Sequence, residues 1–179
     1  MVGKCVTLFR ADWLTAFLRG VSWFGDGVWI PVILTILVAL TIYLYKKDKI
    51  LAIIVLLAPL LGQITKSLLK NFFKIGRPET FGCQVLTTYN DKYSFPSGHV
   101  IFYVTLFGLL AYFAFKNWKT WWARFLLSIS VIMILLVGYS RIYLGAHWYL
   151  DVLGGYVIGG TILIISVMIY SYFSKEVND

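Results

Sequence analysis

Five long apolar runs constrain the fold of this 179-residue chain more than any other feature. They cover residues 28–45, 50–70, 99–115, 123–139 and 152–173. A helix needs about 20 apolar residues to cross the hydrocarbon core of a bilayer, and these runs come close to that length. Backbone polar groups cannot stay unpaired in lipid, so each run predicts a helix. We therefore expect an all-α, integral membrane helical bundle with five strong transmembrane spans.

The composition and the N-terminal pattern refine this expectation. The chain is 60% hydrophobic and 13% charged, which is too apolar for a soluble domain of this size. Its length suits one membrane-embedded domain, residues 1–179. Residues 4–24 are amphipathic, with apolar side chains at spacings of three and four. This segment predicts either a helix in the membrane interface or a sixth, short spanning helix, and Gly25-Asp26-Gly27 ends it.

The formal net charge of +8 indicates the kind of partner. Charged residues are few, and no basic patch is interleaved with aromatic side chains, so the excess favours lipids and phosphates over nucleic acid. Cys5 and Cys83 lack the spacing of a structural zinc site, and a disulfide between them stays an open alternative. We expect no metal and no cofactor. The chain carries no signal of an oligomeric state.

Charged and imidazole side chains gather where the apolar runs begin and end. They are Lys70 and Arg77 after the second run, His99 at the start of the third, and Arg141, His147 and Asp151 between the fourth and the fifth. With five spans, all of these ends fall on one side of the membrane. The loops of the other side are short and rich in lysine, which predicts a cytoplasmic location for them. The polar cluster then faces the periplasm or outer leaflet of a bacterial inner (plasma) membrane.

This cluster suggests phosphate chemistry. Three fixed cations with a single carboxylate at membrane depth need an anion to balance them, and Lys and Arg bind phosphate oxygens well. Ser97 and the amide of Gly98, at the start of a helix, can donate further hydrogen bonds. His147 and Asp151 share a helix face, so the carboxylate can hold one imidazole nitrogen and leave the other free to attack phosphorus. His99 can then protonate the leaving oxygen and later activate water.

Lys66 lies one helical turn before Lys70 and has two interpretations. Its ammonium can be satisfied by Gln63 or a carbonyl, which is ordinary for a lysine near the end of a span. Alternatively, Lys66 binds the second phosphate of a diphosphate substrate.

The last run carries a separate pattern of glycines. They are Gly154, Gly155, Gly159 and Gly160, and they predict close helix packing.

Three motifs in this chain resemble the signature of a known family. They are Lys70-x6-Arg77-Pro78, Pro96-Ser97-Gly98-His99 and Ser140-Arg141-x5-His147-x3-Asp151. Their residue types, spacing and order are similar to those of the type 2 phosphatidic acid phosphatase superfamily. That resemblance implies a bundle that usually has six membrane helices. It also implies His147 as nucleophile, His99 as general acid, Asp151 as orienting partner, and Lys70, Arg77, Ser97, Gly98 and Arg141 around the phosphate.

The residues and the resemblance together predict a metal-independent lipid phosphatase that acts through a phosphohistidine intermediate. The lipid phosphate and the bilayer are the expected partners. Undecaprenyl diphosphate or phosphatidylglycerol phosphate is the favoured substrate, and a lipid A phosphatase is the alternative. A phosphotransferase that passes the phosphoryl group to a second lipid is a further enzymatic option. A non-enzymatic lipid transporter, which uses the cationic cavity only to bind headgroups, is the remaining one.

Overall fold

The computed structural model describes residues 11–81, 84–89 and 91–176. Within these residues the chain folds into six α-helices and two short 3-10 helices, and no strand forms there. The elements are α1 (Asp12–Ser22), η1 (Trp23–Gly25), α2 (Trp29–Lys46), α3 (Lys49–Phe73), η2 (Pro78–Phe81), α4 (Gly98–Lys116), α5 (Trp121–Tyr143) and α6 (Tyr149–Glu176). The expected all-α class is confirmed.

Four helices, α3, α4, α5 and α6, are long and apolar enough to cross a membrane. The first expected span, residues 28–45, corresponds to α2, which meets the same criterion only together with the segment before it. Asp12–Gly25 and Trp29–Leu44 form a pair of helices bent by 66° that fits one broken span. The amphipathic segment at 4–24 thus appears as α1 and η1, while residues 4–10, like Cys5 and Cys83, lie outside the described residues. The molecule is a multi-pass membrane protein.

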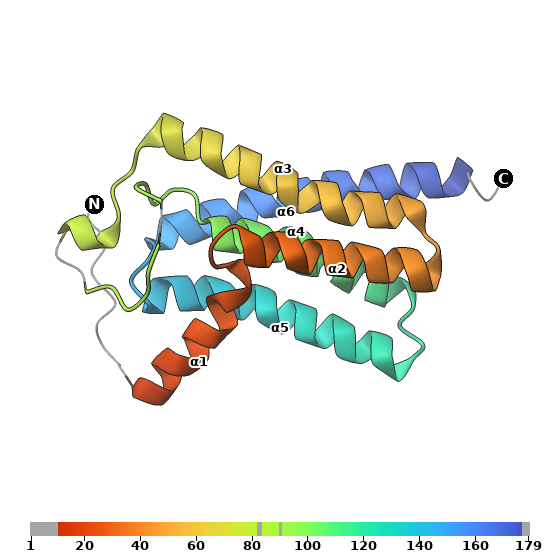
Figure 1. The fold of residues 1–179 in the computed structure, drawn as a ribbon, viewed down its shortest axis with the longest axis horizontal. Coiled ribbons are helices and arrows are strands. Elements are labelled where there is room, and N and C mark those ends of the chain that lie inside the picture. The colour runs from red at the N-terminus through yellow and green to blue at the C-terminus, as the bar shows by residue number, and fades with distance from the viewer. Residues whose placement is uncertain (1–10, 82–83, 90, 177–179) are drawn as a thin grey trace.

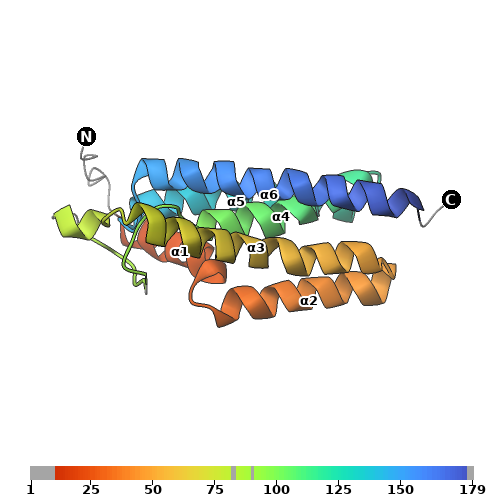
Figure 2. The ribbon, with the colours of Figure 1, turned by 90° about the horizontal axis from the view of Figure 1, so that it is seen from above.

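Helix α4 forms the centre of the bundle. It packs against α3, α5 and α6, and Figures 1 and 2 show it surrounded by these longer helices. Its apolar residues face every direction, which suits a helix with no exposed side; Val100, Phe102 and Leu106 are completely or almost completely buried. Helix α2 lies at the outer edge of the bundle, against α3 (Figure 2). This arrangement places the start of α4 deep in the protein.

Glycines allow α6 to approach its neighbours closely. A Cβ atom on Gly154 would lie 2.4 Å from the Phe95 ring, and one on Gly159 would lie 2.9 Å from Val104 of α4. Gly155 lies against α4 in the same way. The prediction of close packing is wrong only for Gly160, because nothing lies within 4 Å of its Cβ position.

The ends of four helices meet at one end of the bundle. The end of α3, the start of α4, the end of α5 and the start of α6 all lie on the left in Figure 1. Lys70 and Arg141 occupy the last turns of α3 and α5, which end at Phe73 and Tyr143. A backbone hydrogen bond of 3.0 Å from Ser97 N to Asp151 O ties the start of α4 to α6.

Candidate active site

The connection between α5 and α6 presents the first imidazole. Gly145 has a positive φ of 71°, and a Cβ there would lie 2.6 Å from the Gln84 carbonyl oxygen, so only glycine fits this turn. His147 follows, two residues before α6 begins. Asp151 lies in the first turn of α6 and accepts a 2.8 Å hydrogen bond from the Trp148 backbone N–H, as in a capping box. The two residues therefore meet through the helix cap, and the expectation that both lie on the helix is wrong.

His147 and Asp151 form a buried pair. His147 Nδ1 lies 3.4 Å from Asp151 Oδ2, and both side chains are almost fully buried. This distance is longer than a normal hydrogen bond, and Nδ1 has no other partner among the described residues. Catalytic contacts are often long until a substrate binds. Burial lowers the pKa of His147 well below its usual value, and the charges of Arg141 and Arg77 lower it further. The imidazole is therefore neutral, which is its nucleophilic form.

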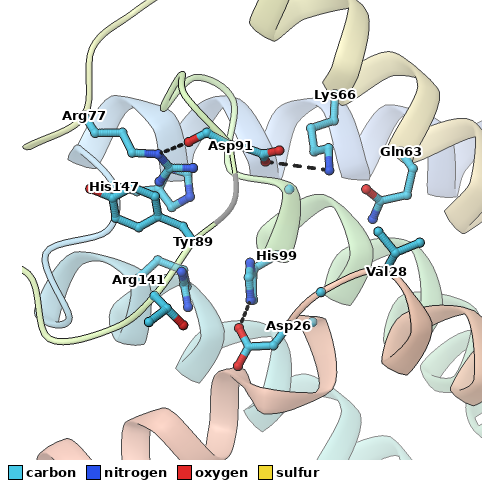
Figure 3. A pocket seen from close by; sticks show the side chains of 14 residues that line it. Asp26, Val28, Gln63, Lys66, Arg77, Tyr89, Asp91, His99, Arg141 and His147 are labelled. Atoms are coloured by element: carbon cyan, nitrogen blue, oxygen red, sulfur yellow. Dashed lines mark hydrogen bonds and ion pairs between the residues drawn. The ribbon is translucent and has the colours of Figure 1, made fainter.

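The second imidazole belongs to His99, in the first turn of α4. Its Nε2 atom lies 2.9 Å from Oδ1 of Asp26. Asp26 comes from the bend between η1 and α2, far from the phosphate motifs in sequence, and Figure 3 shows it directly below the His99 ring. No sequence motif pointed to this carboxylate, and its segment predicted only the end of a helix.

Two arginines contribute permanent charge in different ways. Arg141 is 1% exposed, and its Nε and Nη1 atoms have no hydrogen-bond partner among the described residues. Arg77 is held in place: its Nε donates to the Asp91 carbonyl oxygen and its Nη1 to that of Ala146, both at 2.8 Å. The Arg77 guanidinium also stacks 3.8 Å from the centroid of the Tyr89 ring. Arg141 is thus a buried cation with unused donors, and Arg77 a fixed one.

Two lysines share one carboxylate. Lys70 is buried, and its Nζ lies 3.1 Å from Asp91 Oδ2 and donates to the Tyr93 carbonyl oxygen at 2.6 Å. Lys66 Nζ lies 3.8 Å from the same Asp91 oxygen. Burial raises the pKa of Asp91, but the ammonium groups of Lys70 and Lys66 outweigh it and leave the pKa below its usual value. The expectation that Gln63 or a carbonyl satisfies Lys66 is therefore wrong, because a carboxylate faces it.

These side chains enclose a cavity of about 180 Å³ (Figure 3). Of the residues singled out from the sequence, it is lined by Lys66, Arg77, Gly98, His99, Arg141 and His147. Lys70, Ser97 and Asp151 are not among its lining residues, although all three are buried. Ser97 Oγ has no hydrogen-bond partner among the described residues. The structure thus brings the ends of α3, α4 and α5 and the segment before α6 together around one polar cavity.

The sequence predicted one acid among three cations around the site, and this prediction is wrong. Among the described residues, the four cations Lys66, Lys70, Arg77 and Arg141 are accompanied by the three carboxylates Asp26, Asp91 and Asp151. The missed acids lie in connecting segments, where no helical spacing relates them to the motifs. The glycines beside Asp26 indicated a tight turn, and Asp91 lies within a polar run, so each carboxylate carried only a general signal in the sequence. The described residues contain no group of three His, Cys, Asp or Glu that could hold a metal ion.

An apolar groove between α2 and α3 adjoins the polar cavity. Its volume is about 230 Å³, and it is lined almost wholly by apolar side chains, among them Pro31, Leu60 and Phe102. Gln63 of α3 lines both the groove and the cavity. A second apolar hollow of about 400 Å³ continues along the same two helices and shares Ile36 and Leu56 with the first. Polar and apolar spaces therefore meet at Gln63.

Comparisons with known proteins agree on one family. The family model described as the PAP2 superfamily matches residues 51–175. Phosphatidylglycerophosphatase B of Bacillus subtilis is 29% identical over 161 residues, which cover 88% of this chain and 76% of that protein. The crystal structure of the transmembrane PAP2 type phosphatidylglycerolphosphate phosphatase from Bacillus subtilis superposes with a TM-score of 0.80 at 24% identity. The superposed region covers 98% of this chain and 83% of the Bacillus subtilis structure, which supports the fold.

Two further relatives carry different lipid names. An undecaprenyl-diphosphatase of Sulfolobus acidocaldarius is 32% identical over 151 residues, covering 82% of this chain and 65% of the relative. A lipid A 4'-phosphatase of Porphyromonas gingivalis is 31% identical over 171 residues, covering 87% of this chain and 66% of the relative. This chain is therefore similar to proteins named for three lipid phosphates.

Proposed function

The chain belongs to the PAP2 superfamily, and from this premise we propose that it is a metal-independent phosphatase that removes the terminal phosphate from a membrane lipid. The observation that carries the proposal is Arg141, a buried guanidinium whose Nε and Nη1 have no partner among the described residues. Buried charged donors need an acceptor, and a phosphate entering the cavity supplies three or more oxygens. Lys66 and Arg77 line the same cavity and add positive charge.

The neighbouring imidazoles support hydrolysis in two steps. His147 Nε2 attacks phosphorus while the bond from phosphorus to the lipid oxygen breaks, and His99 gives a proton to that oxygen. Water then attacks the phosphohistidine, His99 takes its proton, and phosphate leaves as the bond between Nε2 and phosphorus breaks. Asp151 stabilises the His147 imidazole as its charge changes. The fixed cations stabilise the charge on the transferring group, so the scheme requires no metal.

The groove between α2 and α3 supports a lipid as substrate. It shares Gln63 with the cavity and offers a hydrocarbon chain an apolar surface beside the proposed phosphate site. Among lipids we favour phosphatidylglycerol phosphate or undecaprenyl diphosphate, the substrates named for relatives in Bacillus subtilis and Sulfolobus acidocaldarius. Lys66 supports the diphosphate, since it borders the cavity one helical turn from Lys70. Lipid A is the second candidate, which the relative of Porphyromonas gingivalis supports.

We further propose that the site faces the outer leaflet, on the periplasmic side of a bacterial inner membrane. The opposite end of the bundle carries the lysine-rich loops after α2 and α4, and such loops stay in the cytoplasm. Labelling of single cysteines introduced at Lys119 and at Lys92, in intact cells with an impermeant reagent, tests this orientation.

Phosphate release from vesicles tests the proposed activity. The purified protein is reconstituted with phosphatidylglycerol phosphate, undecaprenyl diphosphate, phosphatidic acid or lipid A, with and without a chelator. We expect release from at least one lipid, unaffected by the chelator and abolished by His147→Gln. An active His147→Gln protein, or no release from any of the four lipids, contradicts the proposal. Label recovered on an acceptor lipid indicates a phosphotransferase, and lipid movement that survives loss of both histidines indicates a transporter.

A further inference from the structure

The bend between η1 and α2 lies against the catalytic end of α4. Asp26 Oδ1 contacts His99 Nε2 at 2.9 Å, and Gly25 packs on the same ring. A Cβ on Gly25 would lie 2.6 Å from Cδ2, 3.1 Å from Cγ and 3.2 Å from Nε2 of His99. Gly25, the last residue of η1, and Asp26, the first residue of the bend, thus contact the Cδ2 and Nε2 atoms of the imidazole. This segment precedes residue 51, where the family match begins.

The edge that the bend covers identifies the nitrogen that remains available. In an imidazole ring, Nδ1 lies opposite the bond between Cδ2 and Nε2. Gly25 and Asp26 occupy that bond's side of His99, so Nδ1 points the other way. His99 lines the polar cavity together with His147 and Arg141. Gly25 and Asp26 line this cavity as well, and because Asp26 already occupies Nε2, Nδ1 is the ring nitrogen left to reach an oxygen bound there.

The charges around His99 require a carboxylate. Arg141 and Lys66 line the same cavity as His99, and like charges nearby disfavour a second proton on the ring. The other two carboxylates are already committed: Asp151 accepts from Trp148 N beside His147, and Asp91 faces the two lysines. Among the described residues, Asp26 is the carboxylate that pairs with His99. It offsets the positive charge that the ring acquires when it carries two protons.

We propose that Asp26 is the positioning residue of the general acid: it fixes the His99 tautomer, directs Nδ1 at the leaving oxygen and stabilises the imidazolium. This inference rests on the proposed function. As the bond from phosphorus to the lipid oxygen breaks, the proton moves from His99 Nδ1 to that oxygen. Asp26 neither gives nor takes a proton in this step. In the second step, Nδ1 recovers a proton from the water that attacks the phosphohistidine.

The dependence on the leaving group tests this role. A lipid alkoxide needs a proton to leave, whereas 4-nitrophenolate is stable without one. We expect Asp26→Asn to lower kcat on the lipid phosphate by about 10²-fold, within the range of general acid catalysis, and to lower kcat on 4-nitrophenyl phosphate by less than about threefold. Asp12→Asn, which removes the same charge from an exposed position on α1, is the matched control and should behave like the parent protein.

A second variant tests the same role of Asp26 with the lipid substrate alone. Asp26→Glu keeps a carboxylate at the bend, and we expect it to turn over the lipid at least about tenfold faster than Asp26→Asn. Equal losses on both phosphates, or a Glu variant as slow as the Asn variant, would overturn the inference and indicate a structural role. If the parent protein releases no phosphate from any lipid, the proposed function fails instead, so the two failures are distinguishable.

Discussion

The two histidine–carboxylate pairs of this protein are built in different ways. His147 and Asp151 are four residues apart, and a helix cap brings them together. His99 and Asp26 are 73 residues apart, and they meet because the bent N-terminal pair of helices folds against α4. The first pair is almost fully buried, whereas the carboxylate of the second is 37% exposed. A local pair can be found from spacing in the sequence, and a distant pair only from the fold.

The largest effect should follow from changing the local pair. Asp151→Asn keeps an acceptor for the Trp148 N–H but removes the charge beside His147, so the nucleophile loses its orientation and its balancing charge. We expect kcat to fall by about 10²- to 10⁴-fold, as for other carboxylates that orient a catalytic histidine. The loss should be the same for lipid phosphate and 4-nitrophenyl phosphate, because both need the nucleophile. Steady-state kinetics measure it, and a loss restricted to the lipid would show that the two pairs are not distinct.

A smaller effect should follow from pushing the distant pair apart. In Gly25→Ala the new Cβ meets the His99 ring at 2.6 Å, so either the bend or the imidazole must shift. We expect about a tenfold lower kcat on the lipid, since small displacements of a catalytic group are costly. Gly20→Ala is the matched control, because its Cβ has open space and alanine suits a helix. Comparable rates for both alanine variants would refute the close fit between bend and ring.

The smallest effect concerns Asp91, whose carboxylate faces Lys66 and Lys70. Its side chain is 46% exposed, and such pairs contribute only about 0–1 kcal/mol. Asp91→Asn should therefore tighten inhibition by inorganic phosphate about two- to fivefold, because the freed ammonium groups bind the anion. The pKa of Asp91 lies below its usual value, so the carboxylate stays ionised above about pH 4 and the pairing is lost only below that.

Inhibition constants at pH 5 and pH 8 check this prediction. The ratio of the parent's inhibition constant to that of Asp91→Asn should exceed one at both pH values, because the Asp91 carboxylate is ionised at both. A ratio that disappears at pH 5 would show that Asp91 is already protonated there. Asp12→Asn again serves as the control for a lost surface charge.

The sequence predicted the bundle because apolar runs of membrane length leave few alternatives. It also located Arg141 and both histidines at helix ends that meet, since the number of spans fixes which ends share a side. It did not reveal that α2 needs α1 to complete a span, because the bend depends on how the bundle packs. Asp26 and Asp91 were missed for the same reason: connecting segments have no periodicity that relates them to a distant helix.

The unpaired donors of Arg141 link occupancy of the site to the stability of the whole bundle. A buried guanidinium without a hydrogen-bond acceptor destabilises the folded chain. An anion in the cavity supplies that acceptor, and it binds the folded state but not the unfolded one. Mass action then favours folding, by about 2.7 kcal/mol when the free anion is at a hundred times its dissociation constant. If the site binds phosphate as proposed, we expect phosphate or vanadate in the buffer to stabilise the folded protein, and the anion-free state to unfold first in detergent.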